Sequence, residues 1–364
     1  MRSKLVKISS LWLLILWLMA MPGCGSSVRP PALQVAQLAL VANLDANSLS
    51  AFNVDVKSNQ LASVGAMPTG VCMQPRYLEL HPANGFLYAT CQGSNTVAMF
   101  SVDKNAAKLT LMGMPVATGT APTTLEFDPA GKFLYVTNLL GNSLSAYAVG
   151  SGGSLTEIAG SPFATGITPY TVKVSETGKF VYVANRDSNN VNAFRIDPNT
   201  GALTEIAGSP FVTDLGARAI ELSGKFAFVA NRGAANVSVF TVDATTGALT
   251  QVPGSPFAAG FDPRAVAADS SGHFLYVANN GDNNVSAYTI DQATGALTQM
   301  AGSPFPAGQA PLAIEIDDAA KLMYVPNSVS KTVTVYSIDS ATGKLQTVQT
   351  LPTQGFACAV ALVK

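Results

Sequence analysis

The residues with the clearest chemical potential occupy one position of a repeated segment. In six copies of this segment, five of them opened by proline, the residue that follows is Arg76, Thr123, Tyr170, Arg218, Arg264 or Leu312. A guanidinium group presents its N–H donors in a fixed planar geometry that can hold a carboxylate or a phosphate by two hydrogen bonds. If the segments surround one axis, the arginines and Tyr170 predict an anion-binding site at the mouth of a channel. The alternative is that each arginine pairs with a nearby acid or carbonyl group.

A second set lies three residues further along the same segments, at Glu79, Glu126, Lys173, Glu221, Ala267 and Glu315. Apolar residues such as Leu125 and Ile220 precede its members, so alternation in a strand separates an apolar face from a charged, channel-facing one. Two carboxylates about 7 Å apart repel each other by roughly 0.6 kcal/mol in water and about 2.4 kcal/mol at an effective dielectric constant near 20. A solvated channel tolerates this repulsion without any ligand, whereas a drier one needs Lys173, a bound cation or a shared proton. We expect no resident metal or other cofactor, and we leave a channel-bound cation open.

Other catalytic and metal-binding patterns are absent from the sequence. The two histidines, His81 and His273, fall next to turns, and we expect both on the surface. No Gly-x-Ser-x-Gly motif supports a serine hydrolase, and no Cys/His spacing suits zinc. The acidic turn 187–190 lacks the glycine and the distant glutamate of a calcium loop.

The elements that position the polar sets form an internal repeat. A phrase of the type aromatic-Val-Ala-Asn, or a variant of it, ends at residues 43, 91, 138, 185, 231, 279 and 327, with spacings of 46–48 residues. Each period holds a proline-led strand (122–127), a second strand (133–138), a third strand (144–147) and a fourth strand that ends in Gly-Ser-Pro-Phe, as at Gly160. Seven periods of four strands predict a β-propeller.

The two ends of the repeat predict how the ring closes. The first copy starts with its second strand near Leu38, and the last segment, 356–363, is an extra strand of the missing kind. We therefore predict an all-β, seven-bladed propeller with four-stranded antiparallel blades over residues 36–364. Its C-terminal strand completes the first blade and removes the unpaired edges. The seventh member of the second set is then Ala361 or Leu362.

With these phrases in view, the chain resembles the lactonase-type seven-bladed propellers, which include bacterial phosphogluconolactonases, and the propellers built on Tyr-Val-Thr-Asn repeats. The resemblance covers nearly all of the chain after the N-terminal segment. For enzymatic members it implies a Pro-Arg-His phrase that opens an inner strand and an Asn-Glu-Leu phrase that ends the next one. The nearest phrases here are Ala217-Arg218-Ala219 and Asn231-Arg232-Gly233, which keep the arginine but lack the histidine and the glutamate.

Three functions are compatible with these observations. Because the family's histidine and glutamate are missing, we favour a ligand-binding or interaction module whose arginine-rich mouth takes a small anion. The second interpretation is a lactone hydrolase, in which Arg76, Arg218 or Arg264 holds the substrate and Glu126 or Glu221 activates water. Its candidate catalytic residues are Arg218, Glu221 and Glu126. The third is a surface scaffold that contacts envelope proteins through its Asn-rich turns.

Composition and the N-terminal segment indicate the class of protein. The chain is 48% hydrophobic and 12% charged with a formal net charge of −1, which excludes a disordered chain and gives no basic surplus for binding nucleic acid. Three basic residues precede an apolar run, 11–21, that is too short for a membrane helix, so residues 1–23 indicate a secretory signal. Met21-Pro22-Gly23-Cys24 resembles a bacterial lipobox, which implies cleavage before Cys24, lipidation of Cys24 and a tether over residues 24–35. The alternative is an ordinary signal with an incidental cysteine.

We therefore expect an exported monomer that contacts the membrane of the cell envelope only through its lipid anchor. Its partner is a small anionic ligand or an envelope protein. Three cysteines follow Cys24, and an oxidising compartment favours one disulfide and one free thiol among them. The spacing of Cys72, Cys91 and Cys358 does not identify the pair.

Overall fold

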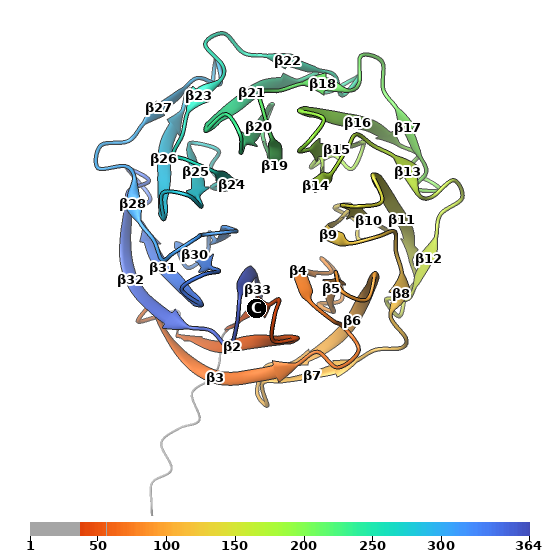
Figure 1. Cartoon of the computed structure of the whole chain (residues 1–364), viewed down its shortest axis with the longest axis vertical. Helices are drawn as coiled ribbons and strands as arrows, with labels where there is room; N and C mark the ends of the chain where they lie inside the picture. Colours follow the sequence, from red (N-terminus) through yellow and green to blue (C-terminus); the bar gives the residue numbers. More distant parts are fainter. Residues whose placement is uncertain (1–36, 56) are drawn as a thin grey trace, which may run out of the picture. The chain divides into compact units, whose positions relative to one another are not determined.

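Seven antiparallel sheets surround a central axis in the computed structural model, which describes residues 37–55 and 57–364 (Figure 1). This confirms the predicted seven-bladed propeller. The signal segment, the tether and Cys24 lie outside the described residues. Across the two described ranges, no helix has the length and the apolar character needed to span a bilayer.

The strands of the first four blades follow the repeat. The first blade holds β1 (Gln37–Asn43), β2 (Ser48–Asp55), β3 (Gln60–Pro68) and β33 (Ala357–Val363). The second holds β4 (Pro75–Leu80), β5 (Leu87–Cys91), β6 (Thr96–Asp103), β7 (Lys108–Leu111) and β8 (Val116–Ala117). The third holds β9 (Pro122–Phe127), β10 (Phe133–Asn138), β11 (Ser143–Val149), β12 (Leu155–Glu157) and β13 (Phe163–Ala164). The fourth holds β14 (Pro169–Val174), β15 (Phe180–Asn185), β16 (Asn190–Ile196), β17 (Leu203–Glu205) and β18 (Phe211–Val212).

The remaining blades repeat the same order. The fifth holds β19 (Ala217–Ser223), β20 (Phe226–Asn231), β21 (Asn236–Val242), β22 (Leu249–Gln251) and β23 (Phe257–Ala258). The sixth holds β24 (Pro263–Ala268), β25 (Phe274–Asn279), β26 (Asn284–Ile290), β27 (Leu297–Gln299) and β28 (Phe305–Pro306). The seventh holds β29 (Glu315–Asp317), β30 (Leu322–Asn327), β31 (Thr332–Ile338) and β32 (Leu345–Pro352).

Closure of the ring follows the prediction. The C-terminal strand β33 pairs with β1, from Leu38 opposite Val363 to Asn43 opposite Ala357. The innermost strand of the first blade is thus supplied by the end of the chain. Strand β33 covers the edge of β1 that would otherwise lack a hydrogen-bonded neighbour. This pairing closes the ring and protects β1 from association with another edge strand.

The outermost strand differs from the prediction in blades two to six, because it is split into two short strands that pair with the same neighbour. In the third blade it is split into β12 and β13, which both pair with β11, so Gly-Ser-Pro lies between the halves rather than at the end. The hydroxyl of Ser161 accepts a hydrogen bond of 3.0 Å from the Ala146 backbone N–H. The serine hydroxyl therefore replaces the backbone carbonyl oxygen that an uninterrupted outer strand would offer to this N–H group. The same bond recurs in the next three blades, at Ser209, Ser255 and Ser303.

The repeated aromatic and asparagine residues have architectural roles. Asn138 donates from its amide to the hydroxyls of Ser143 and Ser145 and so fixes the turn between the second and third strands. The hydroxyl of Tyr182 donates to the Gly247 carbonyl oxygen of the following blade at 2.8 Å. These bonds join the strands within a blade and each blade to the next. The repeated aromatic and asparagine residues therefore stabilise the ring, and the candidate functional residues lie on the innermost strands.

Apolar side chains fill the spaces between successive blades. One cluster joins Tyr135 and Ala146 of the third blade to Val172, Val183 and Phe194 of the fourth. Because both faces of a blade are covered, its strands need few charged residues, which accounts for the low charge of the chain.

A disulfide joins Cys72 to Cys91, with their Cα atoms 5.0 Å apart. Cys91 stands at the repeat position that Asn138 occupies in the third blade, and the disulfide ties the end of β5 to the loop that precedes β4. A bridge over 19 residues is worth about 3 kcal/mol when it restricts the unfolded chain. Among the described residues, Cys358 is a free and buried cysteine.

Candidate functional site

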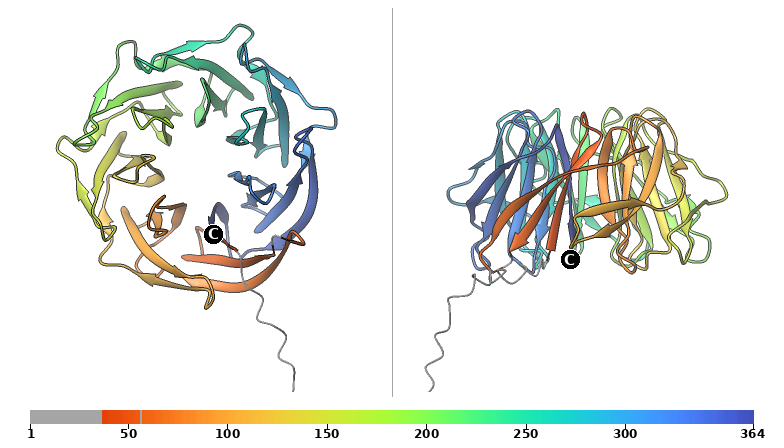
Figure 2. Two further views of the ribbon diagram at one scale, coloured as in Figure 1. Left: turned by 180° about the vertical axis from the view of Figure 1, so that it is seen from behind. Right: turned by 90° about the horizontal axis from the view of Figure 1, so that it is seen from below.

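The innermost strands β4, β9, β14, β19, β24, β29 and β33 surround the central opening when the ring is viewed from either face (Figures 1 and 2). The cavity within this opening is lined by Arg76, Tyr170, Arg218, Arg264, Leu312 and Cys358, and by Lys173, Glu221, Ala267 and Glu315. We call the first group the arginine level. The second group, together with Glu79 and Glu126 at the same repeat position, is the glutamate level. The structure therefore brings the arginines, Tyr170 and part of the second predicted set into one cavity, whereas Glu79 and Glu126 are not among the residues that line it.

A β-bulge explains why both levels face the channel. In the second blade Pro75 lies opposite Cys91 and Tyr77 opposite Thr90, so Arg76 has no partner on the neighbouring strand. The same irregularity leaves Tyr170, Arg218 and Arg264 unpaired in their blades. Strict alternation would place residues three apart on opposite faces. The extra residue of the bulge turns the arginine level toward the channel together with the glutamate level.

Two guanidinium groups of the arginine level converge on one hydroxyl. Arg218 donates from Nη2 to the Tyr170 hydroxyl oxygen at 2.6 Å, and Nη2 of Arg76 donates to the same oxygen. The guanidinium carbon of Arg218 also lies 4.0 Å from the centroid of the Tyr170 ring. Its Nη1 donates to the Arg264 carbonyl oxygen at 2.6 Å.

Neither Arg76 nor Arg218 forms an ion pair with a described carboxylate, although Arg218 is only 3% exposed. Burial, reinforced by the neighbouring cations Arg76 and Arg264, holds the pKa of Arg218 well below its usual value. Burial likewise lowers the pKa of Arg76. The arginine level therefore carries positive charge that the surrounding side chains do not compensate.

Arg264 behaves differently, because it forms an ion pair with Asp262, which it shares with Arg232. The Asp262 carboxylate lies 2.8 Å from Arg264 Nη2 and 2.7 Å from Arg232 Nε. Although burial opposes its ionisation, these two guanidiniums hold the pKa of Asp262 below its usual value. Arg232 and Ala219 stand where the resemblance expects a glutamate and a histidine. The histidine and the glutamate of the enzymatic members are therefore missing from these two positions.

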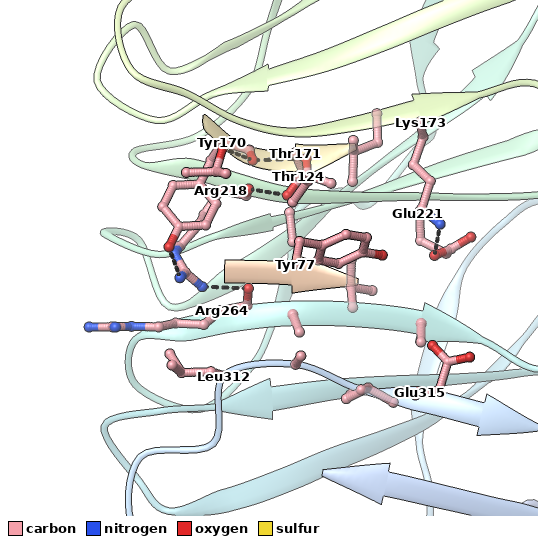
Figure 3. A pocket seen from close by; sticks show the side chains of 18 of the residues that line it. Tyr77, Thr124, Tyr170, Thr171, Lys173, Arg218, Glu221, Arg264, Leu312 and Glu315 are labelled. Carbon is pink, nitrogen blue, oxygen red and sulfur yellow. Dashed lines mark hydrogen bonds and ion pairs between the residues drawn. The ribbon is translucent and has the colours of Figure 1, made fainter. Parts of the chain in front are cut away.

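The glutamate level carries one cation among four carboxyl groups. Lys173 Nζ lies 3.7 Å from Glu126 Oε1. It also lies 3.4 Å from Glu221 Oε2, as Figure 3 shows. Burial raises the pKa of Glu126 to about 7, with Lys173 opposing the shift. Burial also raises the pKa of Glu315 to about 7, and burial together with Glu126 raises that of Glu79 well above its usual value. Part of this level is therefore protonated at neutral pH.

Two residues that sequence reasoning did not place in the channel line the cavity. Tyr77 extends into it from β4, and burial followed by the charge of Glu79 raises the pKa of its hydroxyl (Figure 3). The register of β33 puts Cys358 at the arginine level and Ala361, not Leu362, at the glutamate level. Burial raises the pKa of the Cys358 thiol to about 11, so it stays protonated at neutral pH. An alignment of residues 356–363 with the other innermost strands that allows for the extra residue of the bulge predicts that Cys358 lies at the arginine level.

The histidines lie outside the cavity. His273 is exposed in a turn as expected, but His81 is buried, so its predicted surface position is wrong. Its Nδ1 accepts the backbone N–H groups of Ala83 and Asn84, which leaves the proton on Nε2 to donate to the Gly131 carbonyl oxygen at 2.8 Å. This histidine therefore joins two blades. Over the residues that the structure describes, no group of three His, Cys, Asp or Glu side chains is placed to hold a metal ion.

Known proteins share this architecture. The solved structure of a Bacteroides fragilis protein provisionally described as a 6-phosphogluconolactonase superposes with a TM-score of 0.80 at 19% identity, covering 92% of this chain and all of that one. A periplasmic gluconolactonase from Pseudomonas aeruginosa gives a TM-score of 0.75 at 19% identity, covering 90% of this chain and 99% of that one. A catalytically inactive virginiamycin B lyase from Staphylococcus aureus gives 0.55 at 15% identity, covering 79% and 92%. At these identities the likeness establishes the fold alone.

Family assignment rests on the sequence match. No curated protein sequence matches the chain. The family model described as lactonase, seven-bladed β-propeller, matches residues 32–127, 117–214 and 207–307, which is most of the chain. The matched span covers β1 to β28, that is, the strands of the first six blades other than the closing strand β33. The chain therefore belongs to the lactonase family of seven-bladed β-propellers.

Proposed function

We propose that the channel binds a small organic anion whose charged group is held between Arg76 and Arg218. The observation that carries this proposal is the meeting of two guanidinium groups on the hydroxyl of Tyr170, neither of which forms an ion pair with a carboxylate of the described residues. A carboxylate or phosphate placed there would supply the missing negative charge and accept paired hydrogen bonds.

The glutamate level indicates the character of the remainder of the ligand. Three residues of extended strand separate the two levels by about 10 Å. At that distance Tyr77, Lys173, Glu221 and Glu315 offer donors and acceptors to several hydroxyl groups. A polyhydroxylated acid of about six carbons spans both levels, with its anionic end at the arginines.

Titration with sugar acids tests this proposal. Gluconate and 6-phosphogluconate should raise the unfolding temperature by several degrees, because a ligand at about 100 times its Kd adds about 2.7 kcal/mol to the free energy of unfolding. Glucose at the same concentration and sodium chloride at the same ionic strength are the controls. An equal shift with glucose or with salt, or no shift with either acid, would contradict anion recognition at the channel.

Hydrolysis of a lactone is the second candidate function, and the raised pKa of Glu126 favours it. Glu126 can take a proton from water while the water oxygen attacks the lactone carbonyl carbon, and Lys173, 3.7 Å away, can face the negative charge on the carbonyl oxygen. The ring C–O bond then breaks, and the departing oxygen takes the proton that Glu126 accepted from water. Membership of the lactonase family and the gluconolactonase named among similar structures support this candidate.

The pH dependence of lactone hydrolysis should identify the base. With glucono-δ-lactone, kcat/KM should rise as the pH increases through about 7, because Glu126 is active once its proton is lost. The Glu126→Gln variant should lose this limb and at least 100-fold in kcat, whereas Glu176→Gln, on the exposed surface, should match the wild type. If the wild type hydrolyses the lactone no faster than buffer, the channel binds anions without turning them over.

Export and lipid anchoring at Cys24 complete the proposal. The disulfide between Cys72 and Cys91 supports an oxidising compartment. A soluble sugar acid or an envelope protein would then meet a monomeric propeller held at the cell envelope.

A further inference from the structure

Three methionines of the second blade line one hollow on the outer part of the ring, away from the channel. Met99 lies on β6, and Met112 and Met114 follow β7 (Figure 1). The Met112 N–H donates to the Met99 carbonyl oxygen at 2.8 Å, so the two side chains start from neighbouring strands. Gly113, at a φ of 76°, turns the chain between Met112 and Met114. The glycine-rich turn 152–154 of the third blade closes the other side of the hollow.

The architecture of the blade does not require these methionines. The third blade has Ala146, Ile158 and Ser161 at the corresponding positions, and the serine hydroxyl supports the β11 backbone. In the sixth blade Met300 is the counterpart of Met112, but its companions there are Ala287 and Ser303. Three methionines therefore line one hollow at positions where the repeat elsewhere uses one long apolar side chain, one alanine and one serine.

The chemistry of the lining restricts what the hollow can hold. It contains no carboxylate, imidazole, amine or guanidinium group, and Ser154 is its single polar side chain. Hard cations and anions consequently find no partner there. Thioether sulfur is a neutral, soft ligand that favours monovalent copper and silver over magnesium, calcium or zinc. Met114 is 84% exposed and Met99 and Met112 are half-buried, so an ion can reach the sulfur atoms from solution.

We propose that this hollow binds one soft monovalent metal ion, Cu(I) or its analogue Ag(I), through the thioethers of Met99, Met112 and Met114. Binding involves no change of oxidation state, because the ion exchanges water for sulfur ligands. The site is independent of the channel, and its occupancy needs no bound anion.

Silver titration of the full chain, labelled with ¹³C at the methionine methyl groups, tests the proposal. Cys24→Ser and Cys358→Ser remove the thiols that would compete for the ion, and retention of the unfolding transition shows that this background is folded. The methyl signals of Met99, Met112 and Met114, each assigned from its Met→Leu variant, should move together and saturate at one equivalent of Ag(I). The absence of these shifts, or equal shifts of all methionine signals, overturns the proposal.

Affinity measurements with matched variants provide the second criterion. Met114→Leu, a change of an exposed side chain, should weaken Ag(I) binding at least tenfold without altering the unfolding temperature. Met300→Leu makes the same change at the counterpart of Met112, whose companions are Ala287 and Ser303, and should leave the Kd unchanged. An unchanged Kd for Met114→Leu, or equal losses in both variants, shows that the three sulfur atoms do not act as one site.

Discussion

Replacing Arg218 with methionine is expected to abolish the stabilisation of the protein by gluconate and 6-phosphogluconate. Within the arginine level, Arg218 contributes one of the two guanidinium groups that form no ion pair with a described carboxylate. Its Nη2 lies 2.6 Å from the Tyr170 hydroxyl oxygen at the proposed anion position. A hydrogen bond to a charged group is worth about 1.5–3 kcal/mol, so the loss of a bidentate pair should raise the Kd by about 100-fold or more. Isothermal titration of each acid into the two proteins measures the difference.

The same substitution separates a binding role from a structural one. Methionine fills a similar volume without charge, and it relieves the repulsion among Arg76, Arg218 and Arg264 that burial intensifies. Without an anion, the variant should therefore have a free energy of unfolding about 1 kcal/mol higher than that of the wild type, as measured by denaturant unfolding. Arg195→Met, on the exposed outer part of the fourth blade, is the control and should keep full affinity. A large loss of stability in Arg218→Met would instead show that Arg218 supports the fold.

The ring itself was predictable because its signals are local and repeated. Tyr135 and Asn138 recur with their spacing because every blade needs the same contacts to its neighbour and the same tie across its turn. The missing first strand and the surplus last strand predicted the closure between β1 and β33. The split outer strand was not predictable from alternation, because Ser161 replaces a backbone acceptor through its side chain.

The sequence predicted which residues lie near the axis of the ring, but not which charged side chains form ion pairs with one another. Repeat alignment alone placed Arg76, Arg218 and Glu126 near the axis. Whether an arginine is neutralised depends on residues of other loops and blades, as Asp262 shows by binding both Arg264 and Arg232. The bulge that turns the arginine level toward the channel could not be predicted either, because no particular amino acid marks its position. Arg76, Tyr170 and Cys358 all occupy it.

Glu315→Gln is expected to remove part of the decline in stability of the protein between weakly acidic and neutral pH, to which Glu79 and Glu126 also contribute. Burial raises the pKa of Glu315 to about 7, above the usual value of a glutamate in an unfolded chain. Between about pH 4.5 and 7 the folded protein retains a proton that the unfolded chain releases, so the free energy of unfolding falls as the pH rises. Below this range the wild type and the variant should be equally stable, and by pH 8 the variant should be more stable by on the order of 2 kcal/mol.

Glu315 suits this experiment better than Glu126, because it lines the cavity without an ion pair to a described cation, whereas Glu126 supports Lys173. Urea unfolding at a series of pH values compares Glu315→Gln with the wild type and with the exposed-surface variant Glu176→Gln. The Glu176→Gln curve should run parallel to the wild-type curve throughout. If Glu315→Gln also runs parallel to the wild type, water in the channel solvates the carboxylate fully, and the glutamate level then holds its full negative charge at neutral pH. In that case Glu126 would be ionised well below pH 7 as well, and the rising limb expected for lactone hydrolysis would move to lower pH.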